Sequence, residues 1–258
     1  MVADETSQSY VDPGDPLRLE FEYVGRICEA LDAVVWAGAV RPDDARRPRV
    51  VHIGGAGMTI PRWVEARHPR TAQIVLEPDS DLVAEVRRKL PLPRNSGIKV
   101  RELPGREGIA AMPADYTDAV VLDAFVGSRV PASLSTAEFF EELRLRLRPG
   151  GLFATNIADK APFGWTKRFV AGVAERWSSV VVCAEPAIWK GRRYGNLVVF
   201  AGDALPLTEL ARLAAHAVFP QTLISGRELR RWLGGAQPWT DADAQDSAAP
   251  PGGRGWFG

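Results

Sequence analysis

The stretch that decides the fold is Val50 to Trp63, which reads VVHIGGAGMTIPRW. Its apolar run ends in a turn of small residues, which are Gly54, Gly55, Ala56 and Gly57. Thr59 can then cap a helix whose first turn tolerates Pro61. Small residues let the backbone approach a ligand, and a helix N-terminus offers N–H groups to polar or anionic atoms. The stretch therefore predicts a strand, a ligand-binding turn and a helix.

Outward from this stretch, short apolar runs alternate with amphipathic segments, a pattern typical of βαβ units and a parallel sheet. We expect strands at 49–54, 72–77, 98–102, 118–123, 151–157, 179–184 and 195–201. Helices are expected near 60–67, 80–90, 105–112, 136–147, 165–176, 207–217 and 226–233. The last two strands flank a loop rich in Gly and Arg, which favours an antiparallel pair. The predicted class is α/β, with a seven-stranded, mostly parallel sheet and an antiparallel last strand.

The composition divides the chain into three parts. Residues 1–48 hold a turn-rich arm and an amphipathic helix over 17–36, whose apolar residues recur at three- and four-residue steps. Residues 49–233 form the Rossmann-like domain with its C-terminal helices. Residues 234–258 are rich in Gly, Ala, Pro and Asp without periodicity, so we expect a disordered tail.

Glu77 strengthens the prediction of a nucleoside site. It ends the next predicted strand, 20 residues after Gly57. A carboxylate there can accept hydrogen bonds from both ribose hydroxyls of an adenosine-containing ligand. NAD is less favoured because the third glycine of its fingerprint would fall on Ile60. The alternative for Glu77 is a solvated residue at the end of a strand.

Asp123 is the second candidate carboxylate, and it follows the apolar run Ala119 to Leu122. In open α/β sheets, ligands lie beyond the carboxyl ends of the strands, where this side chain is expected. A carboxylate at that edge could deprotonate an amine nucleophile or orient a substrate. The alternative is a helix or loop cap.

The charge and composition exclude several classes of protein. Lys plus Arg and Asp plus Glu both number 32 in 258 residues, so a basic field for nucleic acid or anionic membrane is absent. No window approaches the roughly 20 apolar residues of a membrane helix, and the first ten residues lack a secretory signal, which favours a cytoplasmic protein. The histidines are dispersed, and Cys28 and Cys183 lie far apart, so no metal is expected.

The motifs together resemble class I S-adenosylmethionine-dependent methyltransferases. They are more narrowly similar to the spermidine synthase-like (polyamine aminopropyltransferase) family of actinobacterial type. The resemblance covers roughly residues 8–202. It is carried by the stretches 8–12 (QSYVD), 54–57 (GGAG), 59–63 (TIPRW), 123–131 and 147–151 (LRPGG), together with Glu77.

The resemblance implies S-adenosylmethionine or its decarboxylated form as cofactor and a small amine as acceptor. The residues implied to bind the cofactor are Gly54, Gly55, Ala56, Gly57, Glu77, Asp123 and Ala124. Asp123 would also be the catalytic base, and the loop from Phe125 to Leu134 would close over the substrates. The residues implied to bind the acceptor are Gln8, Tyr10, Glu185 and Trp189. A homodimer is left open.

Three positions depart from the family pattern. Gly57, Val126 and Pro104 stand where spermidine synthases usually carry acids. Burying ammonium groups without partners is costly, so these changes weaken the expected binding of a diamine. Two alternatives to aminopropyl transfer therefore stay open: an S-adenosylmethionine-dependent methyltransferase acting on a small molecule, and a catalytically silent nucleoside-binding or scaffold protein.

Overall fold

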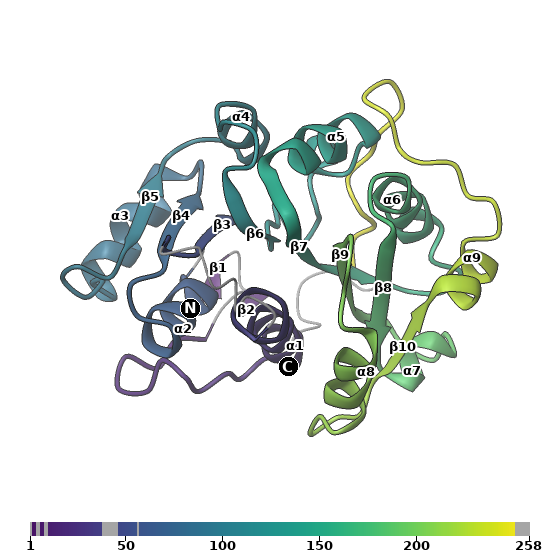
Figure 1. Ribbon diagram of the computed structural model, residues 1–258, viewed down its shortest axis with the longest axis horizontal. Helices are drawn as coiled ribbons and strands as arrows, with labels where there is room; N and C mark the ends of the chain where they lie inside the picture. The colour runs from purple at the N-terminus through teal and green to yellow at the C-terminus, as the bar shows by residue number, and fades with distance from the viewer. Residues whose placement is uncertain (1, 4–5, 8–9, 38–45, 56, 251–258) are drawn as a thin grey trace.

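The computed structural model describes residues 2–3, 6–7, 10–37, 46–55 and 57–250 (Figure 1). Within these ranges the main sheet has eight strands in the order β10-β8-β9-β7-β6-β3-β4-β5. The strands are β3 (Arg49–Ile53), β4 (Ala72–Leu76), β5 (Ile98–Arg101), β6 (Thr117–Leu122), β7 (Leu147–Asp159), β8 (Ser179–Ala184), β9 (Gly195–Gly202) and β10 (Thr222–Ser225). A separate antiparallel pair joins β1 (Val2–Ala3) to β2 (Thr6–Ser7).

Strands β7, β6, β3, β4 and β5 run parallel, as their apolar runs predict. β9 lies between β7 and β8 and is antiparallel to both, which confirms the expected antiparallel pair. β4 pairs with β3 on one side, and β6 pairs with β3 on the other. The carboxyl end of β3 is thus the switch point, where open α/β sheets place their ligands.

Helices cover both faces of the sheet (Figure 1). The α-helices are α1 (Glu22–Leu31), α2 (Thr59–Arg67), α3 (Ser80–Lys89), α4 (Gly105–Ala110), α5 (Ala137–Arg146), α6 (Gly164–Ala174), α7 (Pro186–Trp189), α8 (Leu207–Ala215) and α9 (Gly226–Leu233). α1 continues into a π-helical turn, η1 (Asp32–Trp36), and a 3₁₀ turn, η2 (Ala132–Leu134), precedes α5.

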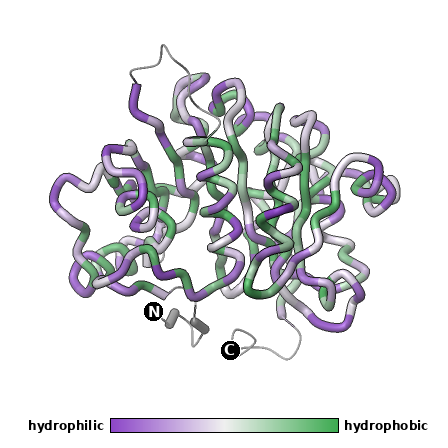
Figure 2. The backbone as a smooth tube through the Cα atoms, turned by 60° about the horizontal axis from the view of Figure 1, so that its bottom comes forward, coloured by the Kyte–Doolittle hydropathy of each residue, from purple (hydrophilic) through white to green (hydrophobic). Residues whose placement is uncertain are grey.

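Successive side chains of the strands belong alternately to two apolar cores, one on each face of the sheet. Val51 and Val120 belong to the core beneath α4, α5, α6 and α9. Val50 and Val121 belong to the core beneath α1, α2 and α8. In Figure 2 the strands in the middle are largely hydrophobic, whereas many of the outer segments are hydrophilic. Burial on both faces explains why these strands are apolar almost throughout.

The prediction of seven strands is wrong by one. β10 pairs antiparallel with β8, Thr222 lying opposite Ala184. It is a four-residue edge strand that begins and ends with hydroxyl side chains, so it lacks the apolar run that marks the other strands. The sheet therefore extends beyond the seven predicted strands.

The predicted disordered tail also differs from the structure over residues 234–250. Trp239 is only 7% exposed and Ser247 only 2%, and the main chain of Trp239 accepts a hydrogen bond from the Ala137 amide at the start of α5. In Figure 1 the yellow segment after α9 runs past α6 towards α5. The bonds that hold it join positions far apart in the sequence, which composition does not reveal. Residues 251–258 lie outside the described ranges.

Among the described residues, no helix is both long enough and apolar enough to cross a bilayer.

Candidate functional site

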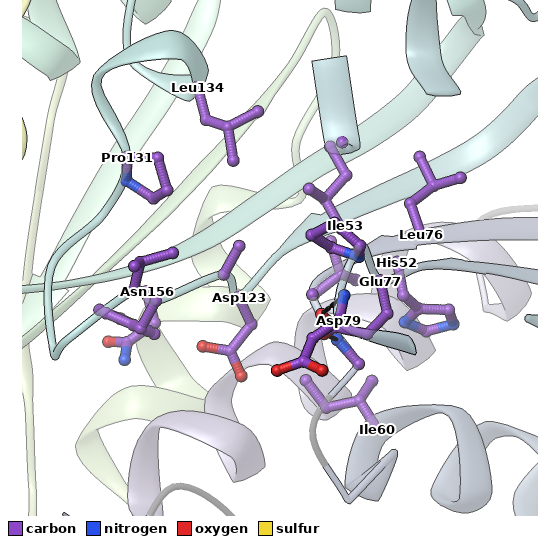
Figure 3. Close-up of a pocket in the computed structure, with 18 of the residues that line it drawn as sticks. His52, Ile53, Ile60, Leu76, Glu77, Asp79, Asp123, Pro131, Leu134 and Asn156 are labelled. Atoms are coloured by element: carbon purple, nitrogen blue, oxygen red, sulfur yellow. Dashed lines mark hydrogen bonds between the residues drawn. The ribbon is translucent and has the colours of Figure 1, made fainter. Parts of the chain in front are cut away.

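A cavity of about 510 Å³ opens at the carboxyl ends of β3, β4 and β6 (Figure 3). Its walls come from the glycine turn after β3, Glu77 after β4, Asp123 after β6, and the loop that follows Asp123. Phe21 and Tyr23, from the start of α1, complete it. Its size is in the range of sites for small molecules, about 300–1,000 Å³.

Gly54 turns the chain away from β3 with φ of +92°, where a side chain is strained. Its amide donates to the Leu76 carbonyl at 2.9 Å, and a Cβ here would lie 2.3 Å from the Asp123 carbonyl oxygen. Glycine is therefore required both by the conformation and by the close approach of two strand ends.

Gly55 and Gly57 continue the turn, whereas Ala56 lies outside the described residues. The Gly55 amide donates to Glu77 at 2.8 Å, and the Gly57 carbonyl accepts from Arg62 at 3.2 Å. Thr59 does not cap α2, since the cap is Met58 in the left-handed conformation.

Glu77 is 9% exposed and is held by the main chain at both oxygens. Oε2 accepts from the Gly55 amide, and Oε1 accepts from the Asp79 amide at 3.0 Å. A carboxylate oxygen has two lone pairs, so each oxygen keeps the capacity for one more donor. Glu77 is a preorganised acceptor at the cavity wall and not a solvated strand end.

Asp123 faces the cavity from the end of β6 (Figure 3). Its amide donates to the Ile53 carbonyl, and its Oδ2 accepts from the Tyr23 hydroxyl at 3.2 Å. Its Oδ1 is buried without a hydrogen-bond partner among the described residues. Burial raises the pKa of Asp123 from 3.8 to about 6, while the bond from Tyr23 acts in the opposite direction.

Asn156 presents a second unused acceptor to the same cavity. The register pairs Leu122 of β6 with Thr155 of β7, so Asn156 comes next to Asp123 at the sheet edge. Its Nδ2 donates to Asn196 at 3.3 Å, whereas its Oδ1 is buried without a partner in the described part of the chain. Two buried oxygens that lack donors favour a ligand with several N–H groups.

The gate loop, residues 125–134, follows Asp123 and supplies one cavity wall. Its tip is a tight turn: Val126 and Arg129 exchange main-chain hydrogen bonds, and Gly127 and Ser128 both have positive φ. Val126 is 71% exposed. Pro131 and Leu134, nearer its end, line the cavity (Figure 3).

Three of the residues implied to bind the acceptor, Tyr10, Glu185 and Trp189, are not part of the lining of this cavity. Tyr10 approaches it through its carbonyl, which accepts from the Thr59 hydroxyl at 2.8 Å, but its ring is not part of the lining. Glu185 forms an ion pair with Arg193, and Trp189 donates to the Thr222 carbonyl. Gln8 lies outside the described residues.

Tyr23, Asn156 and Arg106 line the cavity but were not singled out from the sequence. The pattern of 17–36 did predict an amphipathic helix. The partner of Tyr23 is 100 residues away, so only the three-dimensional structure identifies the pair. Burial raises the pKa of Tyr23 well above 10, which keeps its hydroxyl protonated as a donor.

His52 also lines the cavity but has a structural role. It is 2% exposed, and its Nε2 shares a 2.9 Å hydrogen bond with Gln73. Burial lowers its pKa to about 4, so the ring is neutral at pH 7. Over the described ranges, no cluster of three or more His, Cys, Asp or Glu side chains could hold a metal ion.

The sheet order, the reversed β9 and the switch-point cavity define the class I S-adenosylmethionine methyltransferase-like fold. Human Methyltransferase-like protein 13 in complex with SAH has this fold and superposes with a TM-score of 0.59 at 17% identity. The superposition covers 86% of this chain and 96% of that one. At this identity the likeness concerns the fold alone.

Two further relatives narrow the comparison. A probable spermidine synthase from Corynebacterium glutamicum superposes with a TM-score of 0.79 at 29% identity, covering 88% of this chain and 83% of that one. The polyamine aminopropyltransferase of Chromobacterium violaceum is 26% identical over 156 residues, which are 60% of this chain and 56% of that protein. The expected resemblance to the spermidine synthase-like family is thereby confirmed.

The chain spans about half the length of the curated relatives that it matches. No protein-family model matches it.

Proposed function

We propose that the protein transfers an aminopropyl group from decarboxylated S-adenosylmethionine to a small amine. The observation that carries the proposal is the buried, unpartnered Oδ1 of Asp123, which faces the cavity beside the unpartnered Oδ1 of Asn156. An amine can donate to both of these acceptors. The names of two of the relatives described above support the same reaction.

The nucleoside part of the donor fits the glycine turn and Glu77. Gly54 and Gly55 are needed for the close packing of the strand ends at the cavity, because a Cβ at either position would meet Asp123 or Glu77 within 3.1 Å. The two held oxygens of Glu77 would accept the ribose hydroxyls. Bound here, the sulfonium group would supply an electrophilic carbon next to its sulfur.

Asp123 is proposed as the base for the acceptor amine. An alkylammonium group is protonated at neutral pH and must lose a proton before its nitrogen can attack. With a pKa of about 6, Asp123 is mainly ionised at pH 7 yet more basic than an exposed aspartate. The Tyr23 hydroxyl holds one carboxylate oxygen, which leaves Oδ1 free to take the proton.

Asn156 is proposed to orient the amine, and the gate loop to exclude water from it. Because Asn156 is uncharged, it can accept an N–H without competing with Asp123 for the proton. Residues of the gate loop form the wall next to Asp123. Closing such a loop strengthens the electrostatic interactions inside the site.

A methyltransferase using intact S-adenosylmethionine is the second candidate, and Gly57 favours it. The family acid at this position is replaced by a residue without a side chain. Its loss weakens the preference for the decarboxylated cofactor, which keeps the ammonium group of the intact form but lacks the carboxylate. A homodimer and a cytoplasmic location stay predictions.

Calorimetric titration with S-adenosylmethionine, its decarboxylated form and methylthioadenosine tests these proposals. Tighter binding of the decarboxylated form, followed by aminopropyl transfer to an amine, is the expected result. Preference for the intact form would support methyl transfer instead. If none of the three binds, both enzyme functions fail and the silent scaffold remains.

A further inference from the structure

Residues 237–247, which we name the C-terminal strap, hold the base of the gate loop. The Val130 amide donates to the Ser247 hydroxyl at 2.8 Å, and the Ser247 amide donates to the Val130 carbonyl at 3.0 Å. The Ala132 amide donates to Asp246 at 2.8 Å. The base of the gate loop is thus bonded to a segment more than 110 residues away in the chain.

The two parts of the gate loop differ in burial. Val130 and Leu134, in the base, are 1% and 5% exposed. The tip, residues 126–129, lines the cavity through Val126, Gly127 and Ser128, and the space around a Cβ on Gly127 is empty to 4 Å. Val126 is 71% exposed. The boundary between the buried base and the exposed tip coincides with the first contact of the strap, at Val130.

The strap also holds a second wall of the cavity. Arg106, at the start of α4, lines the cavity, and its guanidinium forms two hydrogen bonds with the Asp241 carboxylate, at 2.6 and 2.8 Å. Glu142 of α5 accepts a third from the same group at 3.3 Å. The Arg106 pKa is raised by these partners, so the side chain is a permanent cation fixed at the wall.

The strap is itself fastened to rigid elements outside the site. Arg168 of α6 donates to the carbonyls of Gln237 and Pro238, both at 3.0 Å, and lies 3.5 Å over the ring of Trp239. The Trp165 ring donates to the Gln245 carbonyl at 2.8 Å. The strap therefore connects helix α6 to two walls of the cavity.

We infer that the strap positions the substrate cavity: Ser247 and Asp246 fix the base of the gate loop, Asp241 fixes Arg106, and only the tip moves over a ligand. Trp239 already covers the apolar core. The contacts of Ser247 and Asp246 end on main-chain amides of the gate loop, so they act on the geometry of the loop. Asp246 and Ser247 are positioning residues that act through Val130 and Ala132.

Hydrogen exchange in the full-length protein tests this inference. The variant Asp246→Ala with Ser247→Ala removes both side-chain acceptors of the gate loop. We expect exchange of the Val130 and Ala132 amides to rise about tenfold, because each of the two loses a hydrogen bond worth roughly that factor. Exchange in β3 and β6 should stay unchanged, which shows that the fold is intact. The control is Ser178→Ala with Asp203→Ala, the same residue types at a site remote from the strap.

Unchanged exchange of the gate loop, or an equal rise in the control, would overturn the inference. A second readout concerns the ligand and rests on the proposed function. The affinity for methylthioadenosine should fall at least fivefold in the strap variant and stay constant in the control. If hydrogen exchange of the gate loop rises while the affinity for methylthioadenosine stays constant, the positioning role is overturned. If the unchanged protein binds no methylthioadenosine, the proposed function fails, while the exchange result still decides whether the strap holds the gate loop.

Discussion

The wall of the cavity that contains Glu77 is built from neighbouring sequence, whereas the wall that contains Asp123 is assembled from distant segments. Gly54, Gly55 and Glu77 belong to one βαβ unit, and main-chain amides hold the carboxylate. Asp123 is joined by Tyr23 from α1, Asn156 from β7 and a gate loop fastened by the strap. The wall with Glu77 is built from backbone groups of neighbouring residues, so substitutions there are poorly tolerated. The wall with Asp123 depends on side chains from separate elements, so substitutions there can more easily change which acceptor binds.

The largest effect that would test this contrast comes from Asp123→Asn. Losing a general base typically costs 10²- to 10⁴-fold, so turnover should fall about a thousandfold. Affinity for methylthioadenosine should stay within twofold, because the wall with Glu77 is intact. Steady-state kinetics and calorimetry measure the two quantities. The control is Asp203→Asn, a surface carboxylate paired with Arg144. Turnover within tenfold of the unchanged protein would remove Asp123 as the base.

The same variant tests the raised pKa of Asp123 through the pH dependence of stability. Because burial raises the Asp123 pKa from 3.8 to about 6, its contribution to stability is fully present below pH 3.8 and is lost as the pH rises through 6. The free energy of unfolding of the Asp123→Asn variant, relative to that of the unchanged protein, should therefore increase by up to about 3 kcal/mol between pH 4 and pH 8. Urea unfolding at several pH values checks the trend.

Gly54→Ala should damage the fold and both walls together. The added methyl would lie 2.3 Å from the Asp123 carbonyl oxygen, at a φ of +92°. We expect the free energy of unfolding to fall by at least about 2 kcal/mol, since backbone clash and strain combine. Gly164→Ala, where 4 Å of space surrounds the new methyl, should change stability little. Urea denaturation compares the two, and equal losses would contradict the role of Gly54.

Glu77→Ala should affect the local wall alone. Loss of hydrogen bonds to a charged acceptor is worth about 1–3 kcal/mol, so affinity for methylthioadenosine should fall between fivefold and 150-fold. Asp81→Ala, an exposed acid in the first turn of α3, is the control and should bind normally. Calorimetry measures this affinity, and an unchanged value would show that Glu77 does not hold the ribose.

Tyr23→Phe should give the smallest change and act on the assembled wall. Its hydroxyl stabilises ionised Asp123, so its removal raises the pKa of that carboxyl further. The acid limb of kcat/KM should move to higher pH, and activity at pH 7 should drop roughly twofold to fivefold. Tyr116→Phe, outside the cavity, should leave the profile in place. If the acid limb does not move, the Tyr23 hydroxyl has no influence on the pKa of Asp123.

The local wall is also the part that sequence predicts best. Apolar runs and glycines marked β3, β4 and β6 and the turn that joins them, because a buried parallel sheet needs those residues at those positions. β10 was missed because its four residues form an edge with little apolar character. The strap was missed because its anchors include the carbonyls of Gln237 and Trp239, groups that every residue possesses. Tyr23 lay in a predicted helix, but its contact with Asp123 depends on how that helix crosses the sheet.

The bond between Val130 and Ser247 also sets an order of events during synthesis. The two residues are 117 positions apart, so a ribosome adding about 5–20 residues per second needs roughly 6 to 23 s to reach Ser247 after Val130. During that interval β3, the glycine turn and β6 can pair, whereas the Val130 amide has no native acceptor. A nascent chain can therefore present a formed wall around Glu77 while the gate loop is still loose. Completion of the cavity has to wait until the chain has been made as far as Ser247.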